Sequence, residues 1–137
     1  MTKTVSPQEA LIYVMVTMSA ADRSMTDNEL RRIGGIVKNL PVFEGFDKER
    51  LVAVAEDCGA LLNEDDSLDG VLALIAASLP AKLYDTAYAL AVDVAAADLD
   101  VEQEELRLLQ LIRDHLDLDP LVCAAIERAA RARFRKL

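Results

Sequence analysis

Carboxylates gather at two places in the sequence where they could bind a metal ion. Residues 93–105 hold six acidic side chains and no basic one, namely Asp93, Asp98, Asp100, Glu102, Glu104 and Glu105. A smaller acidic group occurs earlier in the chain, at Asp22, Asp27 and Glu29. Carboxylate oxygens favour hard divalent cations. The candidate metal ligands are therefore Asp22, Glu29, Asp98, Asp100 and Glu105, and we expect calcium or magnesium rather than zinc.

A structural explanation of these acids stays open beside the metal site. Acidic residues are favoured at the start of a helix, because they cap its N–H groups and interact favourably with its dipole. An EF-hand is excluded. Counted from Asp98, the sixth position of such a loop needs Gly and is Gln103, and the twelfth needs Glu and is Leu109.

The elements that would position these acids are helices. Ala and Leu, which are strong helix formers, contribute 21 residues each to the 137 of the chain. Capping boxes at residues 6–9 and 26–29 and the pair Asp119-Pro120 mark helix starts. We predict a single domain, residues 1–137, that folds as an all-α bundle of about seven helices. Their expected ranges are 7–21, 27–40, 48–62, 67–79, 80–97, 102–115 and a last helix from 120 into the C-terminal tail.

Two features within these helices carry predictions of their own. Gly34 and Gly35 fall inside the second helix, where glycine lowers stability, which indicates either the close approach of another backbone or a mild kink. His115, the only histidine, falls in the last turn of the sixth helix, where a partial positive charge is favourable. We expect it to cap the helix or to serve at the surface.

The two acidic regions belong to an internal repeat. Residues 14–40 align without gaps on residues 90–116, and nine of the 27 aligned positions are identical. The identities include Ala-Ala-Asp at 20–22 and 96–98 and Glu-Leu-Arg at 29–31 and 105–107. Each copy is predicted to be a helix, a short loop and a second helix. We call the connection between the two helices, with its Asp and its Glu, an acidic corner. We expect the first two helices to face the fifth and sixth with pseudo-twofold symmetry, connected by a hairpin of the third and fourth, with the seventh as an addition.

The charge distribution limits the kinds of partner. The chain has a net charge of −9, and its last ten residues, 128–137, hold five basic groups and no acid, which leaves −14 on the rest. Nucleic-acid binding is not expected, because phosphate recognition needs a basic face. The basic residues between Arg128 and Lys136 either complement the dipole at a helix end or dock on an anionic membrane surface or an acidic partner, including a second copy of the chain.

The protein is expected to be soluble and cytoplasmic. No stretch reaches the roughly 18 uninterrupted apolar residues of a membrane span. Cys58 and Cys123 fall among apolar helical residues and form no CxxC pair. We expect them to be reduced core residues rather than zinc ligands.

The repeated corners resemble those of a known family. A helix that ends in Ala-Ala-Asp, a short loop and a second helix with Glu seven residues after the Asp are similar to the tellurite-resistance TerB family, whose domain also occurs at the start of DjlA-type co-chaperones. The matching residues are 20–22 with Glu29 and 96–98 with Glu105. The resemblance implies an all-helical, acidic, cytoplasmic domain associated with resistance to tellurite and related stress. It also implies action through metal binding or protein interaction, without established catalysis.

We interpret the chain as a non-catalytic, TerB-like stress-response module whose acidic corners bind a divalent cation, a protein partner or both. Two other functions stay open. One is an enzyme with a carboxylate-held metal, which needs an enclosed pocket where Asp98 or Glu105 lies beside a second catalytic group. The other is a structural oligomerisation domain, which needs an exposed apolar helix face.

Overall fold

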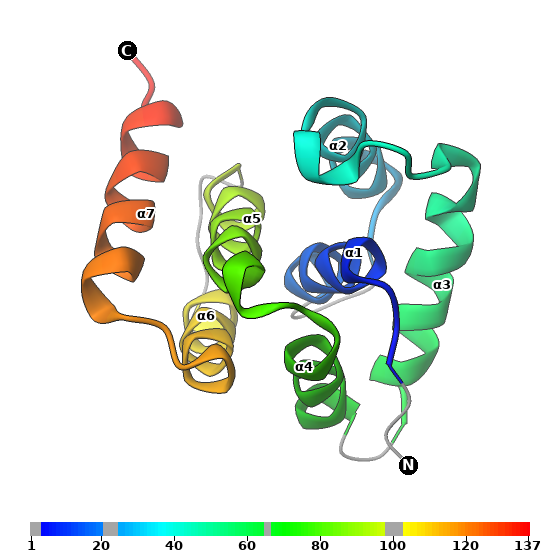
Figure 1. Cartoon of the computed structure of the whole chain (residues 1–137). Coiled ribbons are helices and arrows are strands. Elements are labelled where there is room, and N and C mark those ends of the chain that lie inside the picture. The colour runs from blue at the N-terminus through cyan, green and yellow to red at the C-terminus, as the bar shows by residue number, and fades with distance from the viewer. Residues whose placement is uncertain (1–3, 21–24, 65–66, 98–102) are drawn as a thin grey trace.

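The computed structural model describes residues 4–20, 25–64, 67–97 and 103–137. These residues form seven α-helices and no strand, so the predicted all-α fold is confirmed (Figure 1). The helices are α1 (Pro7–Ser19), α2 (Asp27–Asn39), α3 (Leu51–Leu62), α4 (Ser67–Ser78), α5 (Tyr84–Ala97), α6 (Gln103–Leu116) and α7 (Pro120–Arg133). Three short 3-10 helices connect them, at Pro41–Phe43, Lys48–Arg50 and Ala81–Leu83.

Capping boxes begin the first two helices, as the sequence predicts. At α1 the Ser6 hydroxyl accepts a hydrogen bond from the Glu9 N–H, and the Glu9 carboxylate accepts one from the Ser6 N–H, both at 3.1 Å. Thr26 and Glu29 exchange the same two bonds at α2, at 3.2 and 2.9 Å. Each exchange satisfies two N–H groups that no helical carbonyl can reach.

The third and fifth helices begin later than predicted. Asp47 caps the 3-10 helix Lys48–Arg50, which leads directly into α3. Pro80 likewise precedes the 3-10 helix Ala81–Leu83, which leads into α5. The predicted helix starts thus mark a tighter 3-10 turn, which is frequent at the N-terminus of an α-helix.

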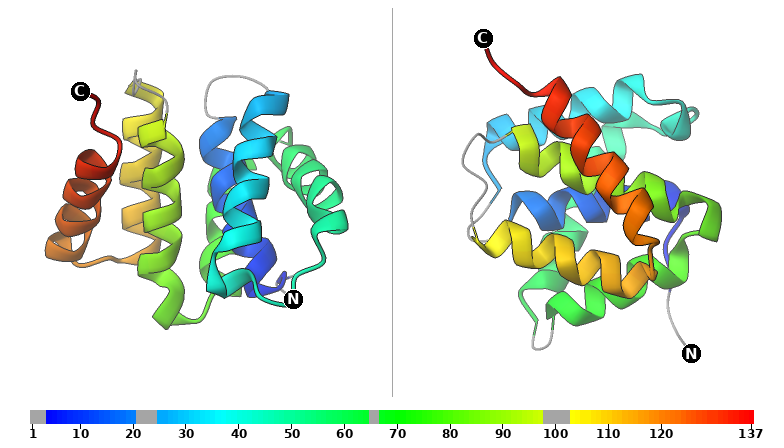
Figure 2. Two further views of the ribbon diagram at one scale, coloured as in Figure 1. Left: turned by 90° about the horizontal axis from the view of Figure 1, so that it is seen from above. Right: turned by 90° about the vertical axis from the view of Figure 1, so that its left-hand side faces the viewer.

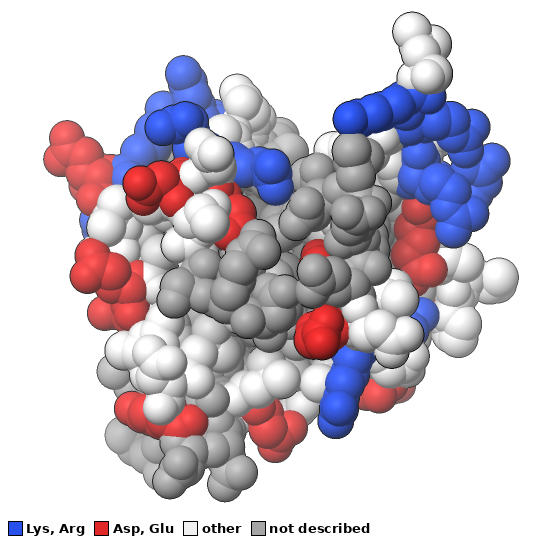
Figure 3. Space-filling view, turned by 180° about the vertical axis from the view of Figure 1, so that it is seen from behind, with Lys and Arg blue, Asp and Glu red and all other residues white. Residues whose placement is uncertain are grey.

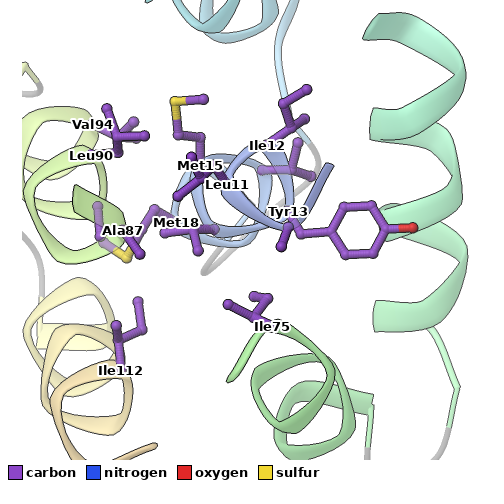
Figure 4. Packing of buried hydrophobic residues seen from close by; sticks show 14 of the residues in the cluster. Leu11, Ile12, Tyr13, Met15, Met18, Ile75, Ala87, Leu90, Val94 and Ile112 are labelled. Atoms are coloured by element: carbon purple, nitrogen blue, oxygen red, sulfur yellow. The ribbon is translucent and has the colours of Figure 1, made fainter. Parts of the chain in front are cut away.

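Helix α1 forms the centre of the core. Every residue from Ala10 to Ser19 is buried, which is typical of a helix that other helices surround. It packs against α5, α3, α4 and α2 (Figures 1 and 2). In Figure 4, Tyr13 of α1 points towards α3, while Leu90 and Val94 of α5 lie on the opposite side of α1.

Small residues of α5 allow this close packing. Ala87 and Ala91 are fully buried and Ala95 is 2% exposed. These alanines recur every four residues, so they lie on one face of α5, and Figure 4 places Ala87 beside α1. Helix α7 packs against α5 as well, and Figure 1 shows it on the side of α5 away from α1.

The fold shows where the two predicted helix pairs lie. Helices α1 and α5 lie against each other, as expected, and in Figure 1 α2 lies above α1 while α6 lies below α5. Helix α2 begins at Asp27 and α6 at Gln103, which are aligned positions of the two copies. The superposition of the two pairs stays a prediction. Helices α3 and α4 are more than a connection, because both also pack against α1.

Of the two explanations for Gly34 and Gly35, the close approach of another backbone is wrong. Within the described part of the chain, a Cβ atom added to Gly34 would meet only the Leu51 side chain, at 3.6 Å, and one added to Gly35 would meet nothing within 4 Å. Helix α2 runs through both positions. The glycine pair therefore lowers the stability of this helix without a packing contact that requires it.

Both cysteines are buried free thiols, as the sequence predicts. Cys58 is 0% and Cys123 is 1% exposed. Burial raises the pKa of the Cys58 thiol to about 11 and also raises the pKa of Cys123. These side chains therefore belong to the core.

None of the helices in the described ranges is both long enough and apolar enough to cross a membrane.

Candidate functional site

The five candidate metal ligands divide into two groups. Asp22, Asp98 and Asp100 lie outside the described residues, whereas Glu29 and Glu105 stand half-buried in the first turns of α2 and α6. Within the described ranges, no three His, Cys, Asp or Glu side chains lie close enough to hold a metal ion together. The predicted cation site therefore depends on the three aspartates and stays a prediction.

Two of the clustered acids have structural partners. Glu29 accepts the capping hydrogen bond from the Thr26 N–H. Asp93 accepts a hydrogen bond from Arg133 at 2.5 Å, an ion pair that connects α5 to α7. These contacts support the structural interpretation of Glu29 and Asp93.

A pocket lies beside the N-terminal parts of α2 and α6. Its volume is about 670 Å³, and its walls come from α1, α2, α3, α4 and α6; we call it the corner pocket. Ala20, Met25 and Leu30 line it from the first copy of the predicted repeat, and Glu104 and Arg107 line it from the second. One cavity therefore touches both copies.

The corner pocket is apolar inside and charged at its edge. Val16 and Leu108 are buried in its wall, whereas Glu56, Glu104 and Arg107 are exposed. Ligand pockets in proteins commonly have this build, with apolar walls and a few polar groups that fix the orientation of the ligand. The corner pocket can therefore receive an apolar group, with two carboxylates and one guanidinium at its edge.

A second pocket lies between α5, α6 and α7. Its volume is about 570 Å³, and we call it the tail pocket because the C-terminal residues 134–136 line it. On its wall the Tyr88 hydroxyl donates to Glu127 Oε2 at 2.5 Å, and Arg113 Nη1 lies 3.5 Å from the same oxygen. Burial, followed by the hydrogen bond to Glu127, raises the pKa of Tyr88, so its phenol stays a donor. The buried Nε of Arg113 has no hydrogen-bond partner among the described residues.

Sequence reasoning missed Tyr88, Arg113 and Glu127. A fully buried phenol needs a hydrogen-bond partner, but Glu127 is 39 residues away along the chain. One signal was present, because Glu127 shares a face of α7 with Cys123 and Ala130, which are both buried. An acid on an apolar helix face indicates a partner across the interface.

His115 pairs at the surface, which is one of its two expected roles. Its Nε2 lies 3.0 Å from Asp69 Oδ1, so the pair connects α6 to α4. The imidazole is 24% exposed and the Asp69 side chain is 84% exposed.

Comparison with models of protein families tests the family resemblance that the repeated corners indicate. The family model described as Tellurite resistance protein TerB matches residues 8–129. The chain belongs to the TerB family. Comparisons with curated proteins and with solved structures gave no match.

As a TerB-family member, the chain is a tellurite-resistance-type domain. The match includes both acidic corners and every residue that lines the corner pocket. It ends at residue 129, so Ala130, Arg131 and residues 134–136 of the tail pocket lie beyond it. The family match therefore includes the whole described lining of the corner pocket but only part of the lining of the tail pocket.

Proposed function

We propose that this TerB-family domain is a non-catalytic binding module. Its two acidic corners hold a divalent cation, and its corner pocket receives an apolar group of a protein partner. The observation that carries the proposal is the position of the corner pocket, which Ala20 and Met25 border from the first corner and Glu104 and Arg107 from the second. Residues from the two aligned segments, 14–40 and 90–116, therefore line the same pocket.

Charge supports a cation at this place. The five candidate ligands are all acidic, and Glu56 and Glu104 add two carboxylates at the edge of the pocket, where Arg107 is the one cation among the described lining residues. Carboxylates that are close together repel one another, and a divalent cation with oxygen ligands offsets this repulsion. Calcium and magnesium are the ions that such a ligand set favours.

The shape of the pocket supports a protein partner. Apolar volumes of this size accept a large aromatic or aliphatic side chain, and charges at the edge select a complementary partner.

We assign this function to the stress response in the cytoplasm. Thiols such as Cys58 and Cys123 stay reduced in that compartment.

Calorimetric titration tests the cation. The wild type and the double variant Asp98→Asn/Asp100→Asn are titrated with calcium, magnesium, manganese and zinc. We expect saturable heat with calcium or magnesium in the wild type and its loss in the double variant. Glu29→Gln is a second variant, which removes one charge while Gln still accepts the capping hydrogen bond from Thr26.

Glu44→Gln is the matched control, because Glu44 is exposed and lines neither pocket. Its titration should equal that of the wild type. If no ion produces heat or a shift of the melting temperature at millimolar concentration, the cation proposal is wrong and the acids serve only as helix caps and solvated groups.

Self-association is a second candidate function. Helix α7 exposes large apolar side chains, with Leu121 at 80% and Val122 at 37% exposure. Apolar residues on an exposed helix face are typical of an interface. Sedimentation of the wild type against Leu121→Glu decides this point: a dimer that the substitution dissociates supports it, and a wild-type monomer at high concentration contradicts it.

A further inference from the structure

The tail pocket combines an apolar wall with an excess of positive charge. The apolar wall comes mainly from α5 and α6, at Val92, Ala96, Leu106 and Leu109. The charged residues in the described part of the lining are Arg113, Arg131, Arg135, Lys136 and Glu127, a net charge of +3 in a chain of net charge −9. We propose that this pocket binds a long-chain carboxylate, the anion of a fatty acid.

The cations at the end of α7 can bind the carboxylate. Arg133 pairs with Asp93, but Arg131, Arg135 and Lys136 are exposed and form no ion pair with any described residue. Figure 3 shows basic side chains gathered where the chain ends beyond α7. A guanidinium matches the two oxygens of a carboxylate with two parallel N–H donors, so Arg131 and Arg135 suit this head group.

The one acid among the described lining residues does not prevent anion binding. Glu127 already accepts the hydrogen bond from Tyr88, and the guanidinium of Arg113 lies beside it. The positive charge of Arg113 offsets the negative charge of Glu127. The cations of residues 131–136 therefore set the sign of the potential at the other end of the pocket.

The basic residues of the lining lie at one end of the pocket. Glu127 and Arg131 are four residues apart and share one face of α7, while Arg135 and Lys136 follow the end of this helix at Arg133. The alkyl chain lies against the apolar wall of α5 and α6 with its end towards Tyr88, and the carboxylate stays at Arg131 and Arg135.

A bilayer surface is the competing occupant of the same cations. A flat membrane would need exposed apolar side chains, and in the lining of the tail pocket only Leu106 and Phe134 expose more than a third of their surface. Val92 and Leu109 are buried between helices, where a bilayer surface cannot reach them. The placement of the apolar wall therefore favours the alkyl chain of one bound ligand over a bilayer surface.

Titration calorimetry with dodecanoate, below the concentration at which it forms micelles, tests the proposal. We expect saturable binding of one dodecanoate to each chain. Each methylene that enters the pocket strengthens binding about fourfold, so decanoate should bind about 15-fold more weakly. Dodecanol has the same alkyl chain without the charge and should bind about tenfold more weakly or not at all.

Three variants assign the site. Arg131→Gln/Arg135→Gln removes the head-group contacts and should weaken binding by about tenfold or more. Leu106→Glu places an acid at an exposed position of the lining, so it should weaken binding without unfolding the domain, which circular dichroism verifies. Arg128→Gln is the matched control, because Arg128 is exposed on the same helix but does not line the pocket.

Several results would overturn the proposal. Equal binding of dodecanoate and dodecanol would contradict the carboxylate site, and equal loss in Arg128→Gln would indicate nonspecific attraction. Cosedimentation with vesicles of phosphatidylcholine and phosphatidylglycerol, without binding of monomeric dodecanoate, would assign the cations to a membrane surface instead.

Discussion

Replacement of Tyr88 by Phe probes the hydrogen bond that connects α5 to α7. Tyr88 is fully buried, and its hydroxyl donates to Glu127 Oε2 at 2.5 Å. Phe keeps the ring and removes only this donor. The substitution therefore leaves the packing of the ring in place and takes one hydrogen bond from the carboxylate.

The expected loss follows from the surroundings of Glu127. A hydrogen bond to a charged group contributes about 1.5–3 kcal/mol to stability. The Glu127 side chain is 39% exposed, so water replaces part of the lost interaction. We expect Tyr88→Phe to lower the free energy of unfolding by about 1–2 kcal/mol, which for a domain of this length lowers the melting temperature by about 3–8 °C.

Urea unfolding followed by far-ultraviolet circular dichroism measures this difference. Tyr84→Phe is the control, because the Tyr84 hydroxyl donates to a neutral acceptor, the Ala76 carbonyl, at 3.2 Å and should contribute less. An unchanged urea midpoint in Tyr88→Phe would refute the argument. It would mean that the bond to Glu127 contributes nothing beyond what water provides.

The same variant has a distinct dependence on pH. The pKa of Tyr88 is raised above its usual value of 10.0 by burial and then by Glu127, so the protonated phenol stabilises the folded state. This contribution is complete below pH 10 and is lost as the pH rises through the folded-state pKa. The stability difference between the wild type and Tyr88→Phe should therefore shrink above about pH 10.

Three further substitutions test the helices. Gly35→Ala should stabilise the domain by about 0.5–1 kcal/mol, because α2 has open space for a Cβ there; urea unfolding measures the gain. Ala91→Leu should destabilise it by about 1–3 kcal/mol, because Ala91 is fully buried on α5; its melting temperature should fall. Glu9→Gln should lower the free energy of unfolding at neutral pH, where Glu9 is charged. Hydrogen bonds from the Ser6 N–H and hydroxyl and the nearby Arg50 favour the charged carboxylate and lower the pKa of Glu9. The Glu9 carboxylate stabilises the fold above pH 4.5 and ceases to do so as the pH falls through the lowered pKa. Urea unfolding at pH 7 and at pH 3 measures this effect. The free energies of unfolding of the variant and the wild type should differ less at pH 3 than at pH 7.

Each of these substitutions has a matched control. Gly45 has φ +86°, so Gly45→Ala should destabilise the domain where Gly35→Ala stabilises it. Ala125 is exposed on α7, and Ala125→Leu should change stability by less than about 0.5 kcal/mol. Glu44→Gln should leave the acid dependence as in the wild type. A loss of stability in Gly35→Ala, or none in Ala91→Leu, would contradict the packing described for α2 and α5.

Local interactions explain why the sequence predicts the helix starts well. The capping boxes of Ser6 with Glu9 and of Thr26 with Glu29 join residues three apart, so their spacing alone specifies them. The repeated Ala-Ala-Asp corners likewise indicated the TerB family, which the family match confirms. The glycine pair misled because glycine tolerates a close contact without requiring one, and only the neighbours of Gly34 and Gly35 decide whether a contact exists.

The sequence by itself determined an all-α chain, the starts of its first two helices and its family, because each depends on composition or on residues a few positions apart. Only the tertiary structure decided what surrounds α1, since a helix that is apolar on all sides does not specify its neighbours. It alone placed Tyr88 beside Glu127, and residues of α2 and α6 around one pocket. Those contacts join segments far apart in the chain, and their formation depends on how the whole core packs rather than on any local pattern.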